Sequence, residues 1–252
     1  MNKRELLFYD AYESFYAMAK TSNAFSSFCK DAFGADFSQD GFSNIEQINM
    51  ILPHIPHSAD THILDIGCGN GKTLGYLQEK TGCRIHGFDY SEEAIRTAQN
   101  AFPDADFREG VIGDIAYPAE SFDIITSMDT MYFAKDMATF VGQIKQWLKE
   151  DGVFFVGYQE GDVIAKTENA HTTQLSHALT ANGMQYDVAD ITAQTYALLQ
   201  KKRKAALAHQ QAFEAEGNRA WFDMLIGQTE YAAGSLEHFK KNMARYIYIA
   251  RK

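Results

Sequence analysis

Apolar residues near the start of the sequence recur at helical spacing. Between Arg4 and about Lys20 they form one face of an amphipathic helix, made of Phe8, Ala11, Tyr12, Phe15, Met18 and Ala19. A second, shorter helical run ends at Gly34, and Ser43 is placed to cap a third helix. The buried side of that helix is expected to be Ile45, Ile48, Ile51 and Leu52. We therefore predict a helical cap over residues 1–43.

From His62 onward, short apolar strands alternate with helices. The pattern predicts strands at 62–67, 83–90, 105–111, 122–128 and 153–159, with helices at 72–82, 91–102 and 136–152 between them. Gly82 is placed to end the first of these helices and Ser91 to cap the second. Such alternation is typical of βαβ units and a parallel sheet. The prediction is therefore an α/β core over residues 44–192.

The rest of the sequence predicts a helix near 172–181, a weaker strand at 184–192 and a long helical stretch from 193 to about 243. The alternating run RYIYIARK predicts a final strand, which we place at 244–252. At 252 residues, with 46% hydrophobic residues and only four prolines, the chain is expected to form one folded domain. The helical stretch at 193–243 is then an insertion before the last strand.

Charge and cysteine content restrict the possible partners and the compartment. A formal net charge of -10 repels polyanions and argues against nucleic acid as a partner. Acidic residues interrupt the N-terminal apolar positions, so a signal peptide is not expected, and no apolar run reaches the length of a membrane span. Three cysteines without metal spacing fit a reducing cytoplasm. The sequence does not predict an oligomeric state.

A glycine-rich loop follows the first predicted strand, in the segment HILDIGCGNGKT from His62 to Thr73. A loop between a strand and a helix presents backbone N–H groups to a ligand. The dinucleotide pattern GxGxxG requires a third glycine where this sequence has Lys72, and the P-loop pattern requires a glycine where it has Ile66. The spacing therefore excludes both of these phosphate-binding patterns.

The remaining pattern is an acid two residues before GxGxG: Asp65, then Gly67, Gly69 and Gly71. It resembles the first motif of the class I S-adenosylmethionine-dependent methyltransferases. Asp89, at the end of the second predicted strand, resembles the acid that binds both ribose hydroxyls in that family. The resemblance extends from about Ile45 to Gln159. It implies a Rossmann-like, seven-stranded, mostly parallel sheet flanked by helices, with 193–243 as a helical lid.

The resemblance also implies a cofactor, S-adenosyl-L-methionine, and its product S-adenosyl-L-homocysteine. By this resemblance, Asp114 accepts a hydrogen bond from the adenine amino group and the Ile115 N–H donates to a ring nitrogen. Asp65 helps to hold the cofactor's ammonium group. The cofactor-binding residues that it implies are Asp65, Gly67, Cys68, Gly69, Asn70, Asp89, Tyr90, Asp114, Ile115 and Met128. Simpler roles stay open for three of them: a helix cap for Asp89, a turn acid for Asp114 and a structural acid for Asp65.

The methyl acceptor is expected beyond the end of the fourth predicted strand, where ligands lie in open α/β sheets. Asp129 and Tyr132 are the catalytic candidates there, and either could hold or deprotonate the acceptor. Alternatively, Asp129 is only a loop acid and Tyr132 only a packing aromatic. The N-terminal cap is rich in aromatic residues. They could line a site for a cationic or flat acceptor, or they could simply pack in the core. The lid loosely resembles that of the glycine, sarcosine and phosphoethanolamine methyltransferases.

These features predict an enzyme that transfers a methyl group from S-adenosylmethionine to a small molecule whose identity the sequence does not reveal. A domain that binds the cofactor without catalysis is an alternative, because the cofactor motif would be the same. A nicotinamide-dependent oxidoreductase is a further alternative, against which Lys72 argues. His54, His57 and His62 lie in a proline-containing linker, so no metal site is expected there.

Overall fold

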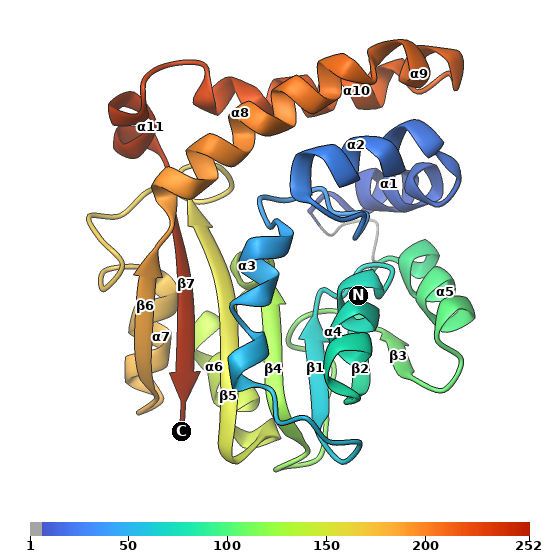
Figure 1. The fold of residues 1–252 in the computed structure, drawn as a ribbon. Coiled ribbons are helices and arrows are strands. Elements are labelled where there is room, and N and C mark those ends of the chain that lie inside the picture. Colours follow the sequence, from blue (N-terminus) through green and yellow to red (C-terminus); the bar gives the residue numbers. More distant parts are fainter. Residues whose placement is uncertain (1–6) are drawn as a thin grey trace.

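A computed structural model describes residues 7–252. Its centre is a seven-stranded sheet with the order β3-β2-β1-β4-β5-β7-β6 (Figure 1). The strands are β1 His62–Ile66, β2 Arg84–Asp89, β3 Asp106–Glu109, β4 Phe122–Met128, β5 Leu148–Glu160, β6 Gln185–Asp190 and β7 Ala244–Arg251. Only β7 runs antiparallel to its neighbours in the described part of the chain. The predicted seven-stranded, mostly parallel sheet is confirmed.

Helices cover both faces of this sheet. One hydrophobic cluster places α6 (Met137–Trp147) and α7 (Gln174–Ala181) against one face. A second cluster covers the other face with α3 (Ile45–Asn49), α4 (Lys72–Thr81) and α5 (Glu92–Ala101), with the short η2 (Leu52–His54) beside them. The order of the strands reverses between β1 and β4, and such a switch point opens a crevice at the carboxyl ends of the strands.

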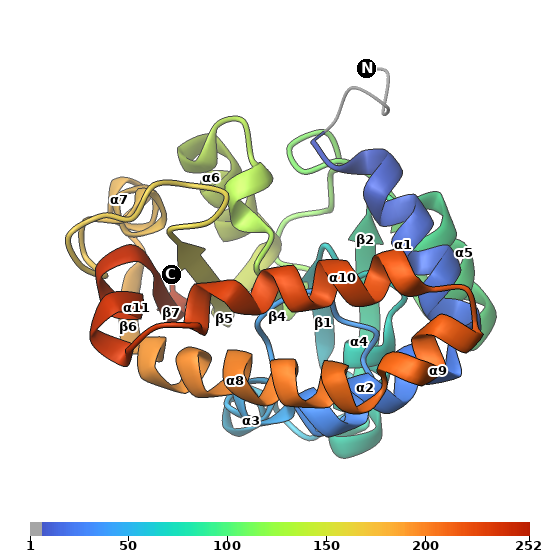
Figure 2. The same ribbon diagram turned by 90° about the horizontal axis from the view of Figure 1, so that it is seen from above.

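A layer of helices lies over that crevice and forms its roof (Figures 1 and 2). It combines α1 (Tyr9–Thr21) and α2 (Asn23–Phe33) with α8 (Thr192–Ala208), α9 (Gln210–Ala215), α10 (Arg219–Gln228), η4 (Thr229–Ala232) and α11 (Leu236–Asn242). Phe25 and Phe28 from α2 pack in one cluster with Leu198 from α8 and Phe222 from α10. Segments far apart in sequence thus form a single layer.

Several predicted helix ends are confirmed by their local geometry. Gly34 and Gly82 end α2 and α4 in the left-handed region, with φ of 83° and 74°. The Ser91 side chain accepts a hydrogen bond from the Ala94 N–H at 3.1 Å and so caps α5. Arg4, where the first helix was predicted to begin, lies outside the described residues.

Three expectations were wrong in detail. Ser43 does not cap α3, because the Asn44 side chain accepts the bond from the Gln47 N–H at 2.9 Å. The helix predicted at 136–152 ends at Trp147, since Leu148 already pairs with Phe122 at the start of β5. The helical stretch predicted at 193–243 is not continuous but divides into α8, α9, α10, η4 and α11, which lets the chain fold back over the sheet (Figure 2).

Candidate cofactor and acceptor site

The glycine loop joins β1 to α4 through three left-handed residues: Gly67, Gly69 and Gly71 have φ of 73°, 53° and 78°. A side chain on Gly67 would collide with Thr130, and one on Gly69 with the phenol of Tyr16 from α1. The loop therefore requires glycine both for its backbone and for the close approach of its neighbours.

Hydrogen bonds fasten this loop to its surroundings. The Gly67 and Cys68 N–H groups both donate to the Phe88 carbonyl, at 2.9 and 3.1 Å. The Lys72 ammonium at the start of α4 donates to Asp36 and to Ser38, each at 2.8 Å. Lys72 thus ties the N-terminal cap to the loop, at the position where the dinucleotide pattern would place a glycine.

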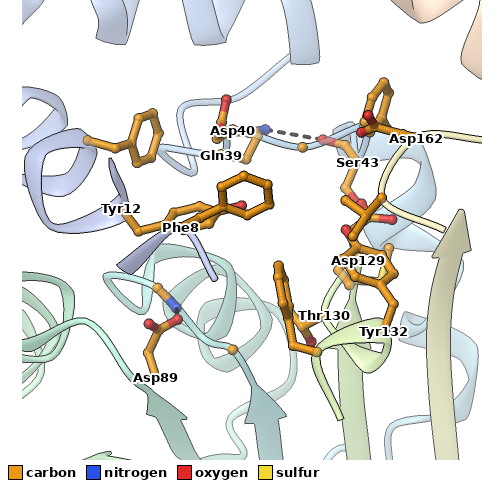
Figure 3. Close-up of a pocket in the computed structure, with 18 of the residues that line it drawn as sticks. Phe8, Tyr12, Gln39, Asp40, Ser43, Asp89, Asp129, Thr130, Tyr132 and Asp162 are labelled. Atoms are coloured by element: carbon orange, nitrogen blue, oxygen red, sulfur yellow. Dashed lines mark hydrogen bonds between the residues drawn. The ribbon is translucent and has the colours of Figure 1, made fainter. Parts of the chain in front are cut away.

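Asp89 ends β2 and faces the cavity beside the loop (Figure 3). One carboxylate oxygen accepts a hydrogen bond from the Gly69 N–H at 3.0 Å and the other from the Ser91 N–H at 2.9 Å. Burial raises the pKa of Asp89 to about 6, although both backbone donors favour the charged form. The Ser91 side chain caps α5, so the Asp89 side chain is not needed as the cap. Each Asp89 oxygen accepts one of these two backbone hydrogen bonds and keeps lone pairs for a ligand.

Asp65 lies near the end of β1 and is buried, with 6% of its surface exposed. The Thr126 hydroxyl on β4 donates to it at 2.6 Å. Burial raises the pKa of Asp65 to about 7, and the neighbouring Asp89 acts in the same direction. This carboxyl group therefore exchanges its proton near neutral pH, and a cation beside it would favour the charged form.

The two acids line a cavity of about 1290 Å³ between the sheet and the helical roof. Its walls come from α1, the loop 37–43, the glycine loop, the ends of β2 and β4, and the lid helices. Figure 3 shows Asp89 on one side of this space and Asp129 and Tyr132 on the other, below Asp40 and Asp162. The volume exceeds the roughly 300–1,000 Å³ of a typical single-ligand pocket, so two ligands can share it.

Most of the predicted site residues meet in this cavity. Those that line it are Asp65, Gly67, Cys68, Gly69, Asn70, Asp89, Tyr90, Met128, Asp129 and Tyr132. Asp114 and Ile115 do not. Asp114 is exposed, and the Ile115 side chain packs against Gly110 and the core cluster of one sheet face. The preceding segment 110–112 lines the cavity in their place.

Asp129 lies directly after β4 with a left-handed backbone (φ 62°), a conformation that is uncommon outside glycine and often found at functional sites. Its N–H donates to the Gly157 carbonyl at 2.9 Å. Its carboxylate forms an ion pair with Arg245 of β7, and both side chains are buried. Ser43 also donates to it, at 3.3 Å, and accepts from Arg245 at 2.9 Å. The negative charge of Asp129 is therefore already balanced.

Tyr132 lies in the short helix η3 (Met131–Phe133) that follows β4. Burial raises the pKa of its phenol well above the ordinary value, and Asp129 adds to the effect. The phenol therefore keeps its proton, and Tyr132 is suited to donate a hydrogen bond rather than to act as a base.

The sequence reasoning missed several groups of this site. Tyr12 belongs to the apolar face predicted for the first helix and Tyr16 to the aromatic residues of the cap, and no contact with the glycine loop was predicted for either. Both line the cavity, and Tyr16 touches that loop. Asp40 lies in the loop 37–43, where no site residue was predicted, and also lines the cavity. The aromatic set of the cap divides accordingly: Phe25, Phe28 and Phe33 are core, whereas Phe8, Tyr12, Tyr16, Phe37 and Phe42 line the cavity.

Residues 7–252 offer neither a metal-binding cluster nor a membrane-spanning helix. No group of three or more His, Cys, Asp or Glu side chains in this range is placed to hold a metal ion. Within the same residues, every helix is too short or too polar to cross a lipid bilayer.

The central part of the chain, which holds the glycine loop, is similar to known proteins. Residues 64–156 match a family model described as a methyltransferase domain. The match covers this central segment and not the helical roof. The matched segment holds the glycine loop, Asp89 and the strands from β1 into β5. S-adenosylmethionine is the cofactor of this family.

Curated relatives match the chain over a similar length. A ubiquinone biosynthesis O-methyltransferase from Actinobacillus pleuropneumoniae is 32% identical over 102 residues, which cover 37% of this chain and 43% of that protein. A trans-aconitate 2-methyltransferase from an Azoarcus species is 28% identical over 107 residues, 42% of each chain. The matches thus span less than half the length of these relatives.

Solved structures resemble almost the whole chain. Phosphoethanolamine N-methyltransferase 2 from Haemonchus contortus, in complex with S-adenosylmethionine, has a TM-score of 0.72 at 18% identity, covering 94% of this chain and 59% of that one. A cyclopropane synthase from Mycobacterium tuberculosis has a TM-score of 0.68 at 16% identity, covering 96% and 98%. At these identities the likeness shows the fold, which is the Rossmann-like fold of the class I methyltransferases.

Proposed function

We propose that the chain transfers a methyl group from S-adenosylmethionine to a small-molecule acceptor. The observation that carries this proposal is one cavity of about 1290 Å³ that joins the glycine loop and Asp89 to a second, roof-covered region around Asp129 and Tyr132. A cofactor site alone would not require this further space. The methyltransferase relatives support the same reaction class.

The residues beside the glycine loop fit the parts of the cofactor by their chemistry. Asp89 keeps lone pairs on both oxygens for two ribose hydroxyls, and Asp65 is an acid that takes a charge beside an ammonium group. Asn70 is buried and lines the cavity in the same loop. The left-handed glycines remove side chains that would otherwise stand between this loop and its neighbours.

The bound cofactor supplies an electrophilic methyl group on a sulfonium centre. The protein contributes chiefly position and exclusion of water, because in-line displacement needs an aligned acceptor. Tyr132 donates a hydrogen bond at the acceptor side, and residues of α1, α10 and α11 line the cavity from the roof. Asp129 is fixed by Arg245 and shapes the cavity floor, and both Asp129 and Tyr132 stay acceptor-side predictions.

Neither alternative has a specific observation in its favour. For a nicotinamide-dependent oxidoreductase, Lys72 occupies the third glycine position and its ammonium is engaged with Asp36 and Ser38. A regulatory domain that only binds the cofactor would leave the acceptor half of the cavity without a purpose. We also keep a cytoplasmic location, and the absence of a nucleic-acid partner, as proposals from cysteine content and net charge.

Two measurements test the proposal. Calorimetry should show binding of S-adenosylmethionine and of S-adenosylhomocysteine to the wild-type protein, and Asp89→Asn should weaken both by about 2 kcal/mol or more, the range for hydrogen bonds to a charged group. A screen of small metabolites, read by mass spectrometry, should then give a product that is one methyl group heavier. Cofactor binding without any methylated product would favour the regulatory alternative instead.

A further inference from the structure

The acceptor half of the cavity is rich in carboxylates. Asp40, Asp129 and Asp162 lie there, and Glu230 lines the same cavity. Two of them are neutralised by arginines: Asp129 by Arg245, and Glu230 by Arg203 at 2.5 Å. For Asp40 and Asp162, the described residues provide only neutral hydrogen-bond donors, as the next contacts show.

Asp40 lies in the loop before α3, on the roof side of the cavity and away from Asp89 (Figure 3). The Gln228 amide of α10 donates to one of its oxygens at 2.8 Å, and the oxygen of that amide accepts from the Lys202 ammonium of α8 at 2.5 Å. Lys202 has no exposed surface and lies over the rings of Phe33 and Phe42. Its charge therefore stays behind the cavity wall, while the Asp40 carboxylate faces the cavity.

Asp162 follows β5 at the same side of the cavity (Figure 3). The Tyr231 hydroxyl donates to one of its oxygens at 2.8 Å and the Gln159 amide to the other at 3.2 Å. The oxygen of the Gln159 amide is buried and has no donor among the described residues. A buried acceptor without a partner calls for a donor group, so this corner lacks hydrogen-bond donors as well as positive charge.

The two carboxylates also repel each other. Burial raises the pKa of Asp40, and Asp162 raises it further, while Lys202 and Gln228 act in the opposite direction. A cation placed between them would relieve both the burial of charge and the repulsion. Basic side chains on the described cavity wall are confined to Lys135 and His238, whereas aromatic rings are plentiful: Phe8, Tyr12, Phe37, Phe42, Tyr132 and Phe133. Aromatic faces attract cations and disfavour anions.

We propose that the methyl acceptor is a cationic amine with an apolar body, whose ammonium group is held by Asp40 and Asp162. This rests on the proposed methyltransferase function and narrows it, because it excludes acceptors that reach this corner with a phosphate or carboxylate. For transfer, the ammonium nitrogen gives one proton to the Asp40 carboxylate. The nitrogen then forms its bond to the methyl group with its own electron pair, while the pair of the broken sulfur–carbon bond stays on sulfur.

Matched probes that differ only in charge test this inference. Phenethylamine, 2-phenylethanol and 3-phenylpropionate, with butylamine, butanol and butyrate as an aliphatic set, are titrated by calorimetry into protein saturated with S-adenosylhomocysteine. The amine should bind at least tenfold more tightly than the alcohol and the acid of its set. Asp40→Asn and Asp162→Asn should each reduce this preference at least fivefold and leave the affinity for S-adenosylhomocysteine within twofold.

Glu230→Gln is the matched control, because Glu230 lines the same cavity but is already paired with Arg203. It should leave the preference for the amine within twofold. The inference is overturned if an alcohol or an acid binds as tightly as its amine, if both Asp variants keep the wild-type preference, or if no amine binds to protein that has bound S-adenosylhomocysteine. Failure of the proposed function gives a different result: either S-adenosylhomocysteine does not bind, or it binds and no acceptor of any charge yields a methylated product.

Discussion

Cofactor affinity is expected to rise with pH, because two carboxyl groups of the cofactor site hold protons in the free protein. The pKa values of Asp65 and Asp89 are raised by burial to about 7 and about 6, against about 3.9 for an unfolded aspartate. A raised pKa stabilises the ligand-free fold below pH 4, and that contribution is lost as the pH rises through 6 and 7. Binding of an ammonium and of ribose hydroxyls has the opposite dependence, since it needs the charged forms.

The size of the effect follows from these two pKa values. At about pH 5.5, roughly 30 molecules have a protonated Asp65 for each one that is ionised, which costs binding about 2 kcal/mol. Asp89 adds a factor of about four at the same pH. By about pH 7.5 both penalties almost vanish, so the Kd should fall about 100-fold across this range. The α-amino group of the cofactor, with an ordinary pKa of about 7.7–8.0, remains largely protonated.

Calorimetry of S-adenosylmethionine binding at three pH values between about 5.5 and 7.5 measures this dependence. Repeating each titration in two buffers of different ionisation enthalpy counts the protons released, which should exceed one per cofactor at the lowest pH. Asp65→Asn should flatten most of the slope, whereas Asp187→Asn, a change at an exposed carboxylate paired with Arg251, should leave it unchanged. A Kd that stays within threefold over the whole range would refute the assignment of these acids to the cofactor.

Two further predictions concern stability. Gly67→Ala should destabilise the protein by about 1–2 kcal/mol more than Gly217→Ala. Both glycines have nearly the same φ (73° and 74°), but only an added side chain at Gly67 would meet a neighbour, Thr130. Equal losses of unfolding free energy in urea would show that this contact is unimportant. Asp129→Asn and Arg245→Met should each cost about 3–5 kcal/mol, since each leaves a buried charge unpaired, and the double variant should cost clearly less than their sum. Additive losses would mean that the two side chains do not form a pair.

Most residues predicted for the cofactor line one cavity, because the sequence information that places them is local. The glycine loop and Asp65 are consecutive with β1, and Asp89 is the last residue of β2. Adjacent parallel strands bring their carboxyl ends together, so residues at these ends meet whatever the rest of the chain does. Asp114 was placed by family likeness alone, and the path of the loop after β3 leaves it exposed.

The acceptor side could not be predicted because its contacts join distant parts of the chain. Asp129 is paired with Arg245, 116 residues away, and Asp40 with Gln228, 188 residues away. Periodicity predicts which face of a helix is buried, but not which other segment will cover that face. Tyr12 illustrates this limit, because it belongs to the predicted helical stripe and yet lines the cavity rather than only the core.

The position of β7 has a consequence for biosynthesis. Residues 244–251 are made after every other described element, yet they lie inside the sheet between β5 and β6. Until they leave the ribosome, the apolar strand β5 has an unpaired edge, and such edges readily pair with other chains. The same late segment brings Arg245 to Asp129. A nascent chain stalled before residue 244 should therefore be both open at the acceptor side and prone to aggregate, so that completing the sheet and completing the site are one event.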